Sequence, residues 1–207
     1  MSTTLPRLSS EIQSAFWGLL LNRGRARASG ARADQLDAAV DAARREIGAM
    51  RTHEGLESMI EKAGNDPASK QAMREAAAIK ITSPEARRET EHRLEPLVSL
   101  LEPNPRAMKL LVNAFGFRQA IQYLSGRPVS EGALARWTIV ELRWPLLADL
   151  LAVHPEYLSA IEKKEAPTEV PENLKALFSN ETVKSVLSGK VSDSLRPLTE
   201  ADIRAIA

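Results

Sequence analysis

The 207-residue sequence contains no cysteine, which excludes disulfides, thiolate metal ligands and a thiol nucleophile. Aromatic residues make up only 4% of the chain, and the abundance of Ala, Leu, Glu and Arg favours helices over sheets. No apolar run approaches the roughly 20 residues that a membrane span needs. The first ten residues also lack the charged-then-apolar order of a secretory signal. We therefore expect a cytoplasmic protein with no transmembrane segment.

The chain has little net charge, because 28 Lys and Arg residues face 27 Asp and Glu residues. This balance argues against a dedicated nucleic-acid binder that works by neutralising phosphates. Residues 22–32 are the exception, with four arginines and no acid. We interpret them as a solvated basic loop, because no aromatic residue is interleaved to stack on bases. Nucleic-acid binding there is the weakest alternative, and it predicts a steep dependence on salt.

Apolar residues at helical spacing, capping residues and proline breaks predict an all-α fold. We expect an irregular bundle of about nine short helices. The clearest patterns cover residues 8–21, 34–50, 53–63, 67–79, 83–101 with a kink at Pro96, 104–126, 130–152 with a break at Pro145, 172–188 and 199–206. Residues 1–162 are predicted to form one domain. Residues 163–171, with the composition of a linker, separate it from a C-terminal helical extension over residues 172–207.

One helix start carries an unusual charge. Asn104 is a favoured N-cap and Pro105 a favoured first residue, so Arg106 falls where the helix end is already partly positive. A cation there is mildly unfavourable unless an anion is bound. Lys109 and Asn113 share its edge of the helix, at i+3 and i+7. Alternatively, Arg106 and Lys109 are solubilising surface cations, or they pair with an acid such as Glu102.

The run NPRAMKLLVNAF resembles the asparagine-proline-arginine helix of the KAP family of P-loop NTPases, a branch of the AAA-like STAND ATPases. In that family NPR is followed by two residues, Lys-Arg, two residues and Asn. The segment LPRLSSEIQSAF is similar to the family's leucine-proline segment after the last strand of the ATPase core. LARWTIVELRWPLLADLL is similar to a later helix with a tryptophan-proline pair, here Trp144-Pro145. The resemblance covers about residues 5–160.

This resemblance implies that the chain is the lid-like, C-terminal helical portion of such an ATPase. ATP, with Mg, would be bound by a P-loop core domain outside this chain. In related AAA-type lids, an arginine at the start of a lid helix senses the terminal phosphate. The resemblance therefore implies that Arg106 senses nucleotide phosphate, supported by Lys109 and Asn113. Leu110 departs from the pattern, because the family often has a second basic residue there.

The sequence has no G-x-x-x-x-G-K-[ST] loop and no apolar strand ending in an acidic pair. We therefore expect no catalysis and no cofactor bound by this chain alone. The histidines fall in separate segments without metal-ligand spacing, so we expect no metal site.

The alternative function is a non-enzymatic helical interaction or regulatory module, which includes self-association. Trp137 and Trp144 are predicted core or interface anchors, and Phe16 and Trp17 are candidates to face a neighbouring domain.

Overall fold

The computed structural model describes residues 31–48, 50, 53–63, 66–101, 104–127, 129–188 and 196–207. Over these residues the secondary structure is all-helical, as predicted, with eleven α-helices and one 3₁₀-helix, η1. The predicted helix over residues 8–21 and most of the basic loop lie outside the described residues. The elements are α2 (Ala31–Ile47), α3 (His53–Lys62), α4 (Pro67–Ile81), α5 (Pro84–Leu94), η1 (Glu95–Leu100), α6 (Pro105–Ser125), α7 (Glu131–Arg143), α8 (Pro145–Val153), α9 (Tyr157–Lys163), α10 (Glu172–Phe178), α11 (Glu181–Ser188) and α12 (Glu200–Ile206).

Caps and prolines set the helix ends where the sequence predicts them. Asn104 caps α6, and Gly126 ends it in a left-handed conformation, with φ of 66°. The kink expected at Pro96 is a change from α-helix to the tighter η1, and Pro145 separates α7 from α8. The single helix predicted over residues 172–188 is two helices. Asn180 accepts backbone N–H bonds from Thr182 and Val183 at 2.9 and 3.1 Å, which starts α11 afresh.

The larger core lies among α6–α12 and η1. Phe115 of α6, Trp137 of α7 and Phe178 of α10 are each buried in it, with no more than 1% of their surface exposed. Val170, inside the segment expected to be a linker, is also buried there. Residues on both sides of 163–171 therefore share one core, and the predicted boundary does not divide two hydrophobic clusters.

A smaller core lies between α2, α3 and α4. Ile47, Leu56 and Ala77 are buried in it together with Tyr123 from the C-terminal end of α6. Lys80 of α4 donates to the carbonyls of Ile47 and Gly48 at 2.8 Å each, which satisfies the open C-terminal end of α2.

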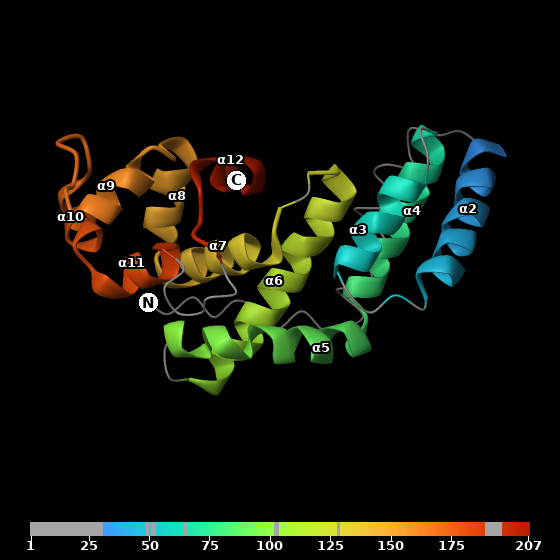
Figure 1. Ribbon diagram of the computed structural model, residues 1–207, viewed down its shortest axis with the longest axis horizontal. Coiled ribbons are helices and arrows are strands. Elements are labelled where there is room, and N and C mark those ends of the chain that lie inside the picture. The colour runs from blue at the N-terminus through green and yellow to red at the C-terminus, as the bar shows by residue number, and fades with distance from the viewer. Residues whose placement is uncertain are drawn as a thin grey trace.

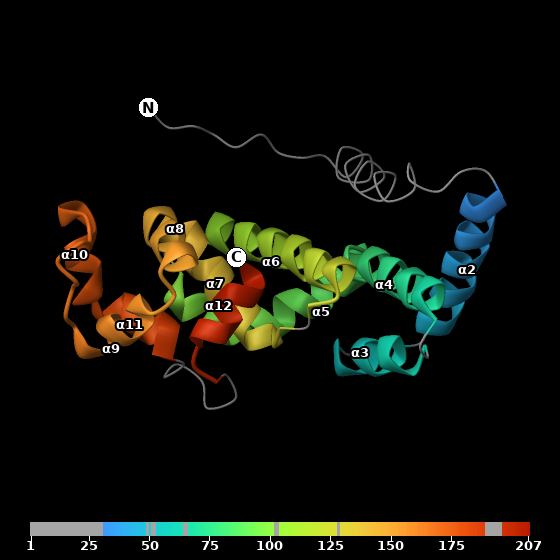
Figure 2. The ribbon, with the colours of Figure 1, turned by 90° about the horizontal axis from the view of Figure 1, so that it is seen from above.

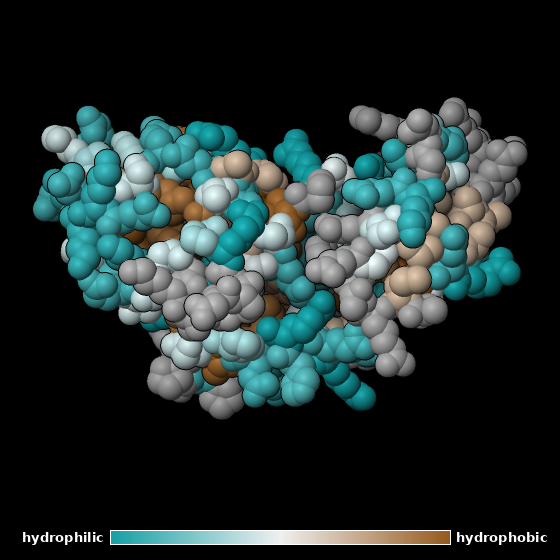
Figure 3. Space-filling view, viewed as in Figure 1, coloured by the Kyte–Doolittle hydropathy of each residue, from teal (hydrophilic) through white to brown (hydrophobic). Residues whose placement is uncertain are grey.

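Helix α6 joins the two cores. Its N-terminal half contributes Leu111 and Phe115 to the larger core, and its C-terminal half contributes Tyr123 to the smaller one. Figures 1 and 2 both show α2–α4 at one end of the molecule, α7–α12 at the other, and α5 and α6 between them. On the face seen in Figure 3, strongly hydrophobic atoms gather over the α7–α12 part. With 21 residues, α6 spans roughly 30 Å between the two ends of the molecule.

Candidate functional site at the start of helix α6

Arg106 is the second residue of α6, and Asn104 caps the N-terminus of this helix. The Asn104 side-chain carbonyl accepts the backbone N–H of Arg106 at 2.9 Å, and its backbone carbonyl accepts that of Ala107 at 2.8 Å. The first turn of α6 contains no acid. The Arg106 side chain is exposed, and it forms no ion pair with any carboxylate that the structure describes. Glu102, the acid considered as its partner, lies outside the described residues.

The polar edge predicted for α6 is present. Lys109 and Asn113, like Arg106, are exposed, whereas Leu111, Val112 and Phe115 are at most 3% exposed. Because the apolar face of the helix packs into the larger core, its opposite edge points away from the protein. The three polar side chains are thus available to something outside this chain.

The capping bonds at the start of α6 decide which groups are left to bind an anion there. The N–H groups of Arg106 and Ala107 are already bonded to Asn104. An anion at this end would therefore be met chiefly by the side chains of Arg106 and Lys109, with the helix macrodipole adding a weaker field.

The structure brings the tryptophan-proline segment close to the same region. Arg143, the last residue of α7, donates to the carbonyl of Leu100, at the end of η1 and only four residues before Asn104. Its guanidinium also stacks over the Trp144 ring at 4.6 Å from the centroid. Sequence reasoning missed Arg143, because no short-range pattern predicts a contact over this separation. Its position beside Trp144-Pro145 was the only available signal.

The four aromatic residues proposed as anchors occupy different environments. Trp137 is 1% exposed and belongs to the larger core, whereas Trp144 is partly buried against it. Phe16 and Trp17 lie outside the described residues. The exposed large apolar residues of this region are others, on α6 and on α7–α8: Leu110, Phe117, Ile121, Leu142, Leu146 and Val153. Two of them, Phe117 and Leu142, border a groove of about 550 Å³ between α6, α7, α8 and α12.

Glu141 lies in this groove with its carboxylate paired to Arg118. Burial raises the pKa of Glu141, and the charge of Asp149 adds to that effect, while Arg118 opposes it. Only 26% of the Glu141 side chain is exposed. The ion pair between Arg118 and Glu141 links α6 to α7. Glu141 and Asp149 both line the groove and give it one acidic wall.

The described residues contain no group of three side chains able to hold a metal ion. His92 and His154 each lie beside a different single carboxylate, Glu95 and Glu156. Across the part of the chain that the structure describes, no helix combines the length and the apolar character needed to cross a membrane.

Compared with protein-family models, with curated proteins and with solved structures, the chain matches none of them.

Proposed function

We propose that this chain is the helical, lid-like portion of a KAP-like P-loop NTPase, and that it senses the phosphate of a nucleotide bound by a core outside the chain. The observation that carries the proposal is Arg106, an exposed cation at the positive end of a capped helix. Among the described residues no acid neutralises it. Such a placement is unfavourable in isolation and becomes favourable when an anion arrives.

The anion contact would couple nucleotide binding to lid position. In the closed state, Arg106 donates to phosphate oxygens, with Lys109 and Asn113 on the same helix edge. Hydrogen bonds to charged groups contribute about 1.5–3 kcal/mol, so losing one lowers affinity by roughly 10- to 150-fold. These contacts exist only in the closed state, so ATP shifts the population toward it and hydrolysis releases the lid.

Helix α6 connects the phosphate contact to both cores. Its N-terminal half packs in the larger core and its C-terminal end packs in the α2–α4 core, so a displacement of Arg106 with its helix moves both. Packed cores resist continuous deformation, and the described helices would therefore move largely as one body.

A titration with a fluorescent ATP analogue tests the proposal. We expect no binding by this chain alone, and binding once a P-loop core is added; a Walker-type loop in the upstream reading frame is the place to find that core. Arg106→Ala should then weaken nucleotide-dependent association about tenfold or more. Arg127→Ala is the matched control, because Arg127 is an exposed arginine just beyond the opposite end of α6. Equal affinities for wild type and Arg106→Ala would contradict the proposal.

The alternative is a non-enzymatic interaction module, and the exposed apolar residues of α6 and α8 are the observation in its favour. In that case Phe117→Ser and Leu146→Ser would weaken partner binding or self-association, measured by sedimentation. Arg106→Ala would leave that binding unchanged.

A further inference from the structure

The groove of about 550 Å³ between α6, α7, α8 and α12 combines apolar walls with one uncompensated acid. Arg106 is not among the residues that line it. Leu142, at the end of α7, is 39% exposed there. The apolar side chains of the groove come from α6, α7 and α8, and most of them are small: Ala114, Phe117, Leu142, Pro145, Ala148 and Ala152.

Four charged or hydroxyl-bearing side chains also line the groove, and three of them are satisfied within the chain. Arg118 and Glu141 form an ion pair with each other. The Thr138 hydroxyl donates to the carbonyl of Leu134 at 2.7 Å. The fourth is Asp149, which is exposed and forms no ion pair with a described residue. Because the charges of Arg118 and Glu141 cancel, the lining side chains carry one net negative charge.

The two carboxylates of the groove repel each other. Burial raises the pKa of Glu141, Arg118 opposes that effect, and the charge of Asp149 raises the pKa further. A cation beside Asp149 would offset this repulsion and supply the missing counter-charge. The groove therefore favours an occupant with a basic group. It disfavours nucleic acid and anionic membranes, because their phosphates would meet like charge.

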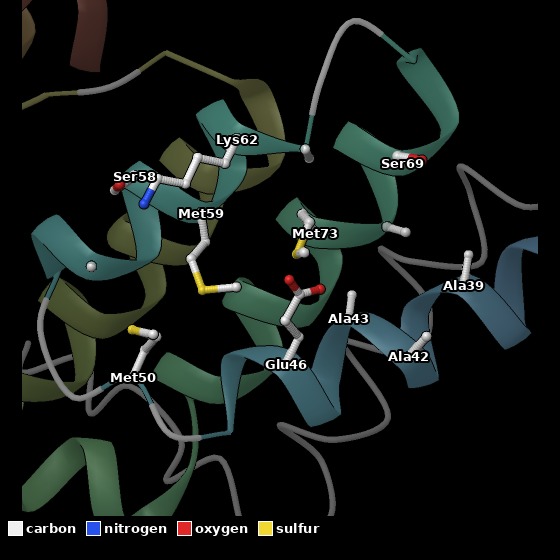
Figure 4. Close-up of a pocket in the computed structure, with 13 residues that line it drawn as sticks. Ala39, Ala42, Ala43, Glu46, Met50, Ser58, Met59, Lys62, Ser69 and Met73 are labelled. Carbon is white, nitrogen blue, oxygen red and sulfur yellow. The ribbon is translucent and has the colours of Figure 1, made fainter.

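Another groove, of about 840 Å³ at the α2–α4 end of the molecule, lacks this asymmetry. Glu46 and Lys62 both line it, so side chains of opposite charge border the same space (Figure 4). Its lining selects no sign of charge in an occupant.

The walls of the groove beside Asp149 suit an α-helix. The elements around it are helices, and they leave no strand edge among the described residues to pair with an extended peptide. A polyproline helix needs several exposed aromatic rings, whereas Trp137 is 1% exposed and only Phe117 is accessible among the lining aromatics. An α-helix satisfies its own backbone groups. Small side chains such as those of Ala148 and Ala152 let its axis approach closely.

We propose that the groove between α6, α7, α8 and α12 binds an amphipathic helix of a partner protein. Apolar side chains of that helix pack on Leu142 and the alanines, and a lysine or arginine beside them pairs with Asp149. The proposal gives a partner class to the alternative function, an interaction module. It does not depend on nucleotide sensing at Arg106, so either idea can fail without the other.

Two synthetic peptides test the proposal on the full chain by fluorescence anisotropy. Both are helices of about 14 residues with leucines at i, i+4, i+7 and i+11, and they carry either lysines or glutamates beside the leucines. At low salt we expect the lysine peptide to bind about tenfold more tightly than the glutamate peptide. Asp149→Lys should reverse that preference. Glu169→Lys, at an exposed acid outside the groove, should leave it unchanged.

Two further variants separate the groove from the start of α6. Leu142→Ala should weaken binding of the lysine peptide about tenfold, and Arg106→Ala should leave it unchanged. Circular dichroism and the urea midpoint establish that each variant is folded. Failure of the lysine peptide to bind, equal affinities for the two peptides, or a lysine preference that survives Asp149→Lys would overturn the proposal. Self-association that Leu142→Ala abolishes, measured by sedimentation without peptide, would also overturn it and assign the groove to a second copy.

Discussion

The charges at the two ends of α6 predict stability changes of opposite sign. Arg106 lies in the first turn, where a cation is unfavourable, and Arg127 lies just beyond the C-terminal cap, where a cation is favourable. Arg106→Glu should therefore stabilise the protein, and Arg127→Glu should destabilise it, each by about 0.5–1 kcal/mol at low salt. Neither side chain forms an ion pair with a described residue, so no lost partner should obscure these signs.

Urea unfolding followed by circular dichroism measures both variants. With a slope of about 2 kcal/mol per molar urea, the midpoints should move by roughly 0.2–0.5 M in opposite directions. Arg106→Ala should stay within about 0.5 kcal/mol of wild type, as expected for an exposed side chain. If Arg106→Glu destabilised the protein by more than about 1 kcal/mol, the guanidinium would be holding the fold together. The reason for placing it at the helix start would then be structural.

Three further substitutions test the packing around α6 and the two ends of the molecule, each by urea unfolding. Gly126→Ala should cost about 1–2 kcal/mol, because φ at Gly126 is 66°, and Gly126→Asn should cost less. Lys80→Met should cost about 1–2 kcal/mol by leaving the end of α2 uncapped, with faster amide exchange in α2 than in α7. Asp202→Asn should cost about 1–2 kcal/mol at pH 7, because Asp202 accepts two bonds from Arg196, at 2.7 and 2.9 Å. Burial alone would raise the pKa of Asp202, but these bonds and those from Thr199 lower it below its usual value. A carboxyl with a lowered folded-state pKa stabilises the protein above its unfolded pKa, so the difference between wild type and Asp202→Asn should disappear as the pH falls through the folded-state pKa. A difference that persisted at the lowest pH would contradict this assignment.

The helix boundaries were predictable because they depend on local chemistry. Asn104 and Pro105 start α6, Gly126 ends it, and Pro145 breaks the α7–α8 pair, all through interactions within a few residues. The same reasoning missed the division at Asn180. An asparagine inside an apolar pattern is compatible with a continuous helix until tertiary packing turns the chain.

Capping residues and prolines could not predict how the helices assemble into the two cores. Residues 163–171 have the composition of a linker, yet Val170 is buried because helices from both sides of it share one core. The candidate site, too, was predictable only in part. The exposed edge with Arg106 followed from helical spacing, whereas the approach of Arg143 to Leu100 depends on where tertiary packing places the end of α7. Contacts between residues so far apart in the chain leave no periodic pattern in a single sequence.

The proposed role of Arg106 is to contact a nucleotide phosphate held by a P-loop core outside this chain. The most direct test measures the dissociation constant between this chain and a P-loop core with and without ATP, for wild type, Arg106→Ala and Arg127→Ala. We expect ATP to tighten the wild-type and Arg127→Ala complexes. Arg106→Ala should lose about tenfold or more of that tightening while its ATP-free affinity is unchanged. The same ATP-dependent tightening in all three proteins would contradict it.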